Sequence, residues 1–185
     1  MVKCETALFT TMRPLPFSRL LIPLLLIFSN MAPKHVHAHP TGSCAKTTET
    51  TRAFVESLFT AVALDNFGQS FAKALSDDLV WTVTGSSPIA GTYVGKQVYI
   101  DEVLTPLRSV LVTLPVPIVE HIFVDCDWAT VNWYSEGVFA KNGADYNMDY
   151  CWLMRVANES IVEVKGFYDG QKVAAAFVGY NFTKS

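Results

Sequence analysis

The chain has 185 residues, of which 50% are hydrophobic and only 17% are charged, and its formal net charge is −3. This length suits one domain with a hydrophobic core of its own. The 14 lysines and arginines are scattered and form no basic patch, which argues against a nucleic-acid partner. The 4 Trp, 7 Tyr and 12 Phe fit either a well-packed core or a cavity lined for an apolar ligand.

Residues 1–38 have the layout of a signal peptide. The apolar run Leu20–Phe28 follows two arginines and precedes small and polar residues. Residues 36–38 (VHA) fit a small-x-small cleavage site, residues 30–32 fit one less well, and a start at Met12 gives a neater signal. The run is shorter than the ~20 residues of a comfortable membrane span. We therefore expect a secreted protein or one of the secretory-pathway lumen, with a signal anchor as the alternative and no stable membrane span.

Entry into the secretory pathway makes the cysteines and the glycosylation sequons informative. Removal of the signal leaves Cys44, Cys126 and Cys151, so at most one disulfide forms within the chain. Cys44 lies in the predicted leader and is able to pair with either partner, so the spacing leaves the pairing open. The sequons at Asn158 (NES) and Asn181 (NFT) predict glycosylation.

The first half of the mature chain is predicted to be mainly helical. After a leader at residues 39–46, apolar residues recur at helical spacing over 47–64 and again, in a shorter helix, over 67–75. A strand is predicted over 79–83, followed by a turn region. A third helix is expected after Gly95, with a kink or break at Pro106, because proline removes a backbone donor.

The second half reads as a meander of antiparallel strands. The predicted strands lie at residues 117–124, 128–140, 146–156 and 161–168. Asn142-Gly143 predicts a tight hairpin, because both residues tolerate positive φ. A short helix is expected at residues 171–177. Helices that precede antiparallel strands predict an α+β domain, with the helices on one face of a curved sheet.

The stretch DDLVWTVTGSSPIAGTYVGKQVYIDEVLTPLRSVL, residues 77–111, combines a short strand ending in Trp, a Gly-punctuated turn, a second strand and an amphipathic helix. In this order it resembles the SnoaL-like/ketosteroid-isomerase-like group of the nuclear transport factor 2-like (NTF2-like) superfamily. The resemblance covers residues 50–177 and implies a domain at residues 47–180. The implied fold is a cone-shaped curved antiparallel sheet with three N-terminal helices packed on its concave face.

The resemblance also implies a candidate acid, Asp169, which matches by position the acid/base that closes the last strand in SnoaL-like cyclases. Asp169-Gly170 is equally an ordinary turn pair. Those cyclases carry a histidine where this chain has Trp152, so their acid/base pair is not reproduced. His121, which lies on a predicted strand, is the candidate replacement, with a purely structural role as the alternative. Related proteins commonly pair through the outer sheet face, which predicts a homodimer.

Period-two alternation over residues 146–156 places Tyr150 and Trp152 on an apolar face that should line the cone. The same reasoning puts Trp133 inside on the preceding strand. A tyrosine hydroxyl in such a wall is able to stabilise an enolate oxygen. The predicted substrate-binding residues are Trp81, Tyr99, Trp133, Tyr150 and Trp152.

Two functions remain open at this stage. One is a cofactor-free acid/base enzyme: a cyclase, isomerase or dehydratase acting on an apolar polyketide- or terpenoid-like intermediate. The resemblance extends to maleidride-type dimerising cyclases of fungal secondary metabolism. The alternative is a non-catalytic secreted carrier or interaction protein on the same scaffold. The sequence has no zinc-type Cys/His cluster, phosphate-binding glycine loop or nucleophile elbow, so neither a metal nor a cofactor is expected.

Overall fold

A computed structural model describes residues 41–182 of the chain. The predicted signal peptide lies outside the described residues, as do residues 183–185. The elements in chain order are α1 (Thr41–Asp65), α2 (Gln69–Ala74), β1 (Leu75–Val83), β2 (Gly91–Val94), α3 (Lys96–Tyr99), the π-helical turn η1 (Ile100–Leu104), α4 (Thr105–Val110), β3 (Ile118–Asp125), β4 (Trp128–Tyr134), β5 (Asp149–Ala157), β6 (Ser160–Phe167) and α5 (Gly170–Ala176).

The six strands form one curved, open sheet in the order β2-β1-β6-β5-β4-β3. All neighbouring strands are antiparallel except β1 and β6, which run parallel and pair Trp81 with Val164. The last strand therefore lies in the middle of the sheet, between β1 from the first half and β5 from the second.

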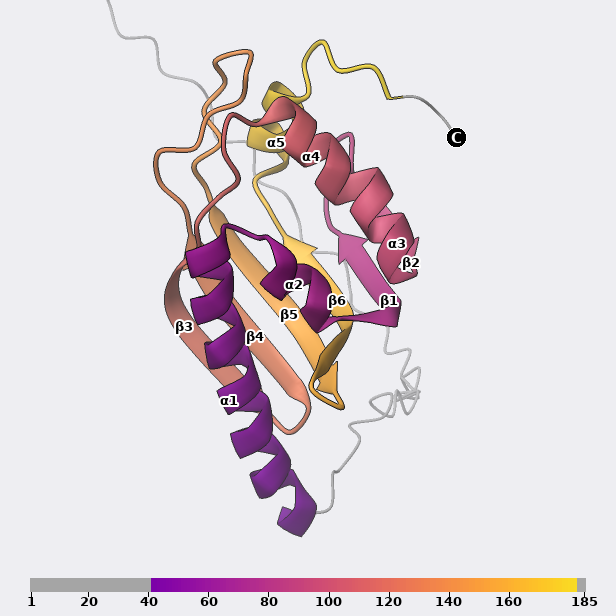
Figure 1. Cartoon of the computed structure of the whole chain (residues 1–185), viewed down its shortest axis with the longest axis vertical. Helices are drawn as coiled ribbons and strands as arrows, with labels where there is room; N and C mark the ends of the chain where they lie inside the picture. The colour runs from indigo at the N-terminus through magenta and orange to yellow at the C-terminus, as the bar shows by residue number, and fades with distance from the viewer. Residues whose placement is uncertain (1–40, 183–185) are drawn as a thin grey trace, which may run out of the picture. The chain divides into compact units, whose positions relative to one another are not determined.

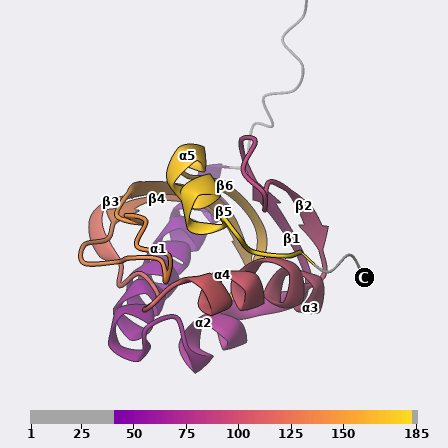
Figure 2. The same ribbon diagram turned by 90° about the horizontal axis from the view of Figure 1, so that it is seen from above.

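Helices α1, α2 and the α3–α4 segment lie against one face of the sheet (Figure 1), and the view from above shows the same separation into layers (Figure 2). The core between these layers is rich in aromatic side chains, and Trp81, Trp133 and Phe71 are among its fully buried members. The α+β fold predicted from the sequence is confirmed. The third helical segment falls between β2 and β3, after the two short strands, as the order of elements in residues 77–111 predicted.

Pro106 does not end the third helix as expected. Instead α3, η1 and α4 follow one another without a gap, and the Thr105 N–H bonds to the carbonyl of Ile100 across a π-type turn. The wider π turn immediately precedes Pro106, which occupies a first-turn position of α4 where its missing N–H is tolerated. The missing backbone donor of Pro106, which we expected to kink the helix, is accommodated by this locally wider turn.

Helix α1 begins at Thr41, six residues before the predicted start, so part of the predicted leader is helical. This added stretch is fastened to the end of the sheet. Cys44 forms a disulfide with Cys126, the Cys126 N–H bonds to Thr48 Oγ1 at 3.0 Å, and Arg52 donates to the Ile122 carbonyl at 3.2 Å. Cys151 is a free cysteine.

Strand β4 ends at Tyr134, earlier than predicted, and β5 starts at Asp149. The intervening segment, residues 135–148, is held by short contacts, including an isolated bridge between Phe139 and Asp145. Its predicted tight turn is present, with Gly143 at φ 87°. Within residues 41–182, no helix is long and apolar enough to cross a membrane.

Candidate ligand-binding site

A small apolar cavity of about 50 Å³ lies between the helices and the sheet. Its walls come from both layers, and the half-exposed side chains among them, Leu107, Leu114 and Tyr168, lie nearest to solvent. The lining residues are Phe67, Val83, Ile89, Tyr99, Val103, Leu104, Leu107, Leu111, Leu114, Pro115, Trp133, Tyr146, Tyr150, Trp152 and Tyr168. A cavity of this volume holds roughly three or four water molecules.

The structure places four of the five predicted substrate-binding residues, Tyr99, Trp133, Tyr150 and Trp152, in this lining. Trp133 and Tyr150 are cross-strand neighbours whose rings stack 3.7 Å apart, and Trp152 meets Trp133 edge to face at 5.2 Å. These contacts fix the aromatic wall, because stacked and edge-to-face rings are favourable arrangements. Their role in binding remains a prediction.

Trp81, the fifth predicted wall residue, lies behind the cavity wall. It is completely buried and stacks on Tyr99 with the ring centroids 4.2 Å apart. Its indole N–H donates to the Tyr168 hydroxyl at 3.2 Å. Trp81 therefore supports two lining residues without belonging to the lining itself.

Four tyrosines, Tyr99, Tyr146, Tyr150 and Tyr168, line the cavity together, and we call them the tyrosine cluster. Burial raises the pKa of each hydroxyl above its ordinary value, and ionisation of one disfavours ionisation of its neighbours. The tyrosines are therefore neutral hydrogen-bonding groups at physiological pH. Among residues 41–182, the side chains around this cavity include no carboxylate, imidazole, guanidinium or ammonium group.

Several polar atoms of the wall are buried without a hydrogen-bond partner among the described residues. They include the Trp133 indole nitrogen and the Tyr150 hydroxyl. The Trp152 indole nitrogen also lacks a partner of good geometry, although it lies near enough to the Tyr168 hydroxyl to oppose the rise in pKa that burial causes there. Burial raises the pKa of Tyr150 and the nearby Ser135 hydroxyl opposes this rise, although neither hydroxyl completes a hydrogen bond of acceptable geometry. Buried polar groups are usually paired. Unpaired polar atoms are thus concentrated around this one cavity.

Two members of the tyrosine cluster, Tyr146 and Tyr168, line the cavity although the sequence analysis did not predict it. Tyr146 precedes β5 with the same alternation as Tyr150, and Tyr168 directly follows β6; neither is among the five predicted substrate-binding residues. Val164, Gly166 and Tyr168 alternate towards the inside, a period-two signal that the sequence did contain. Because Gly166 has no side chain, it does not mark the face.

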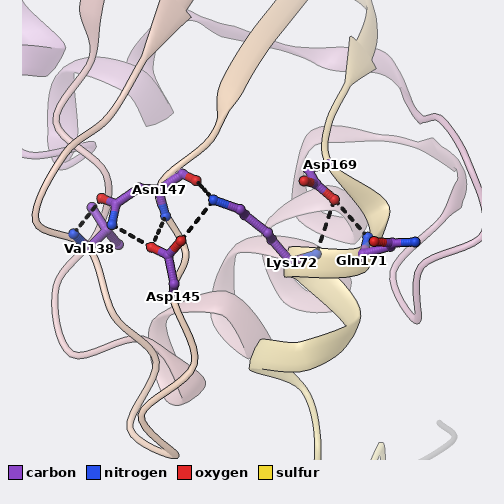
Figure 3. A network of polar contacts seen from close by, with 6 residues as sticks. All are labelled: Val138, Asp145, Asn147, Asp169, Gln171 and Lys172. Atoms are coloured by element: carbon purple, nitrogen blue, oxygen red, sulfur yellow. Dashed lines mark hydrogen bonds and ion pairs between the residues drawn. The ribbon is translucent and has the colours of Figure 1, made fainter.

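Asp169 is the N-terminal cap of α5. Its carboxylate accepts hydrogen bonds from the backbone N–H groups of Gln171 at 2.9 Å and Lys172 at 3.2 Å, as Figure 3 shows. The side chain is exposed and is not among the cavity-lining residues. Aspartate is a favoured capping residue, so the geometry accounts for its presence without catalysis. A catalytic role for Asp169 stays a prediction.

Beside this cap, α5 is tied to the segment that precedes β5. The Lys172 ammonium pairs with Asp145 at 2.8 Å and also donates to the Asn147 carbonyl (Figure 3). The Lys172 ammonium, followed by the backbone and side-chain N–H groups of Asn147 that also donate to this carboxylate, lowers the pKa of Asp145 to about 2. The Asn147 side chain in turn accepts from the Val138 N–H at 2.9 Å. The network is structural: it fixes α5 against residues 138–147.

His121 lies on the outer face of the sheet, away from the cavity. It pairs with Asn132, whose neighbours Val131 and Trp133 point inward, and its ring stacks on Phe123 at 5.9 Å. A shift in register between Val119 and His121 breaks the alternation that the sequence suggested. The side chain is exposed. The structure therefore does not bring His121 and Asp169 together at the cavity, and a catalytic role for His121 stays a prediction.

The remaining sequence assignments concern modification and metals. Asn158 is exposed in the turn between β5 and β6, and Asn181 is exposed in the C-terminal tail. Among the described residues, Cys44, Asp125 and Cys126 are near enough to one another to suggest a metal site, but both thiols belong to the disulfide.

Comparison with solved structures identifies the fold. An NTF2-like protein from Burkholderia xenovorans superposes with a TM-score of 0.55 at 16% identity, covering 70% of this chain and 96% of that one. An NTF2-like protein from Burkholderia thailandensis superposes with a TM-score of 0.58 at 17% identity, covering 69% of this chain and 96% of that one. A candidate isomerase from Rhodopseudomonas palustris superposes with a TM-score of 0.50 at 14% identity, covering 68% of this chain and 93% of that one.

No protein-family profile and no curated protein sequence matches the chain. Identities this low establish the architecture and leave the activity open. The matched structures nevertheless align over nearly their whole length, with the same mixed helical and curved-sheet arrangement that the sequence resemblance implied. The chain has the NTF2-like fold.

Proposed function

We propose that this domain binds a small, neutral, largely apolar molecule in the cavity bounded by the tyrosine cluster, as a carrier or sequestering protein. The observation that carries this proposal is the composition of the wall. Apolar side chains and neutral tyrosines surround the cavity, and no ionised side chain of the described chain lines it. Such a site favours apolar surface and disfavours a charged ligand, because burying an unpaired charge is costly.

The volume of the cavity limits what enters without rearrangement. Ligand pockets for drug-sized molecules commonly measure roughly 300–1,000 Å³, whereas this cavity measures about 50 Å³. A ligand of more than about four heavy atoms, a five-membered cyclic ketone included, would have to displace part of the wall. The segment from Leu111 to Pro117 is the best candidate, because it contributes Leu114 and Pro115 to the lining and contains no regular secondary structure beyond a bridge at Leu111.

A binding experiment tests the proposal. Cyclopentanone and methylenecyclopentane are small neutral probes of matched size, and their binding to the full chain can be followed by ligand-observed NMR and calorimetry. Leu107→Trp should fill the more exposed side of the cavity and abolish binding. Val98→Trp, at a 39% exposed position of α3 outside the lining, is the matched control. Failure of both probes to bind the wild-type chain, or unchanged binding by Leu107→Trp, would refute the proposal.

A cofactor-free acid/base enzyme is the second candidate function. The tyrosine cluster supports it, because neutral hydroxyl donors are suited to holding a developing enolate oxygen. The reaction would be the cyclisation, isomerisation or dehydration of a polyketide- or terpenoid-like molecule, with maleidride-type dimerisation as one form. Such a reaction needs a base, and the proposed Asp169 and His121 lie outside the cavity lining. The carrier function therefore requires fewer additional assumptions.

A further inference from the structure

Tyr168 is held in place by contacts on both sides of its ring. Its hydroxyl accepts the hydrogen bond from Trp81, and Trp81 is itself fixed by complete burial and by stacking on Tyr99. On the other side, the Tyr168 ring meets Tyr150 edge to face with the centroids 5.9 Å apart. The hydroxyl is surrounded by protein, although other parts of the residue are partly exposed.

Gly166 provides the space that this position requires. A Cβ atom added at residue 166 would lie 2.7 Å from both Cε2 and Cζ of Tyr168, closer than real side chains approach. The tyrosine ring therefore folds back over its own strand, across the site of the missing side chain. Any larger residue at position 166 would displace the hydroxyl from Trp81.

The hydrogen bond from Trp81 makes the Tyr168 hydroxyl oxygen an acceptor and leaves its proton free to be donated. An indole N–H only donates, so the phenolic oxygen acts as the acceptor and its own proton remains available. Burial raises the pKa of Tyr168, which keeps that proton in place at neutral pH. Within the described chain, no hydrogen bond donated by this hydroxyl is present. Tyr168 therefore lines the cavity with a fixed phenolic oxygen and a proton that no described residue accepts.

We propose that Tyr168 is the specificity-determining hydrogen-bond donor of the cavity, and that its ligands carry a neutral carbonyl-type oxygen. This inference rests on the proposed binding function and specifies the class of ligand. The unpaired indole N–H of Trp133 adds a further donor to the wall. A carboxylate would be buried without a countercharge, and a hydrocarbon would leave the donors unpaired.

The test compares three probes that share one ring: cyclopentanone, methylenecyclopentane and cyclopentanecarboxylate. The wild-type full chain should bind the ketone more tightly than the hydrocarbon, and the carboxylate least. Tyr168→Phe removes only the hydroxyl and should weaken ketone binding about tenfold, the usual worth of one hydrogen bond. Its binding of methylenecyclopentane should change by less than about twofold. Tyr134→Phe, outside the lining, is the control and should bind both like the wild type.

The possible outcomes separate this inference from the proposed function. Equal affinity of the wild-type chain for ketone and hydrocarbon, or tightest binding of the carboxylate, overturns the inference and leaves the binding function intact. If Tyr168→Phe weakens the binding of ketone and hydrocarbon equally, or weakens neither, the inference is also overturned. The wild-type comparison needs no variant, so it decides the matter even if Tyr168→Phe fails to fold. If no probe binds the wild-type chain, both proposals fall.

Discussion

Cys44, near the start of α1, is joined by a disulfide to Cys126 in the turn between β3 and β4, across a sequence separation of 82 residues. The bridge fastens the first turns of α1 to the end of the sheet, where Thr48 and Arg52 make the neighbouring hydrogen bonds. A long covalent loop of this kind restricts the unfolded chain more than the folded one.

We therefore predict that Cys44→Ser and Cys126→Ser each lower the free energy of unfolding, by roughly 4 kcal/mol in the chain-entropy description of a loop this long. The double variant should lose no more than either single one, because both remove the same bridge. Urea unfolding monitored by circular dichroism measures the loss. Cys151→Ser, at the free cysteine, is the control. Equal midpoints for wild type and Cys44→Ser under oxidising conditions would contradict the prediction.

Asp169 offers a test that separates capping from catalysis. Asp169→Ala removes the α5 cap and should cost about 1 kcal/mol of stability, whereas Asp169→Asn should cost little, because asparagine caps nearly as well. If Asp169 is also the acid/base of an enzyme, Asp169→Asn should lower turnover by ~10²–10⁴-fold. Product profiling in the producing organism makes the measurement, with His121→Gln alongside. Unchanged products in both variants would remove the acid/base assignment.

Alkaline pH should unfold the domain through the tyrosine cluster. In the unfolded chain these tyrosines ionise near their ordinary pKa of about 10, while burial raises the folded-state pKa of all four. Their contribution to stability is therefore complete below about pH 10 and falls as the pH rises above it. Tyrosinate absorbance from the cluster should appear together with the loss of circular dichroism. Full ionisation of these tyrosines in a still-folded protein would rule this out.

The outer face of the sheet is predicted to form a homodimer. Cross-strand pairing sets Phe123, Thr130 and Leu153 in one row, and His121 and Cys151 in the next. Helices α1, α2 and the α3–α4 segment cover the opposite face (Figure 1). Light scattering should give a dimer at micromolar concentration, and Leu153→Glu should give a folded monomer. Val98→Glu, on exposed α3, is the control. A monomeric wild type would count against the prediction.

Asn158 is predicted to carry an N-linked glycan if the chain enters the secretory pathway. It is exposed in a two-residue turn whose members Asn158 and Glu159 both have positive φ, at 51° and 56°. Expression in a eukaryotic secretory host should give a protein that loses mass on enzymatic deglycosylation. Asn158→Gln and Ser160→Ala should each lack one glycan, leaving only the glycan predicted at Asn181. Identical mass before and after deglycosylation would show that neither sequon is used.

Local patterns in the sequence predicted the sheet better than they predicted the site. Alternation on β5 and β4 correctly placed Tyr150, Trp152 and Trp133 inside, because a strand with one buried face repeats every two residues. The pattern could not say which inward residue reaches the cavity. Trp81 and Tyr99 are both buried and stack on each other, yet only Tyr99 lines the cavity, a difference in depth that alternation does not reveal.

The sequence pattern did not predict where the side chains of the two candidate catalytic residues, Asp169 and His121, lie relative to the cavity. The last strand ends at Phe167, two residues before Asp169, and the Asp169 carboxylate caps the first turn of α5, a local preference of aspartate. Strict alternation along β3 would put His121 on the same face as Val119, but the register shift between them places the two on opposite faces. A one-residue irregularity of this kind inverts every side chain beyond it.

The parallel pairing of β1 with β6 sets the order in which the sheet can be completed during synthesis. β1 can pair at once with its neighbour in the chain, β2, but its other edge stays open until the last strand has been made. Because such distant pairing is slow and leaves an unpaired edge, the partly made chain is prone to aggregation. Cys44 and Cys126 both precede β5 and β6. The disulfide is therefore able to close one side of the domain while the central strand of its sheet is still missing.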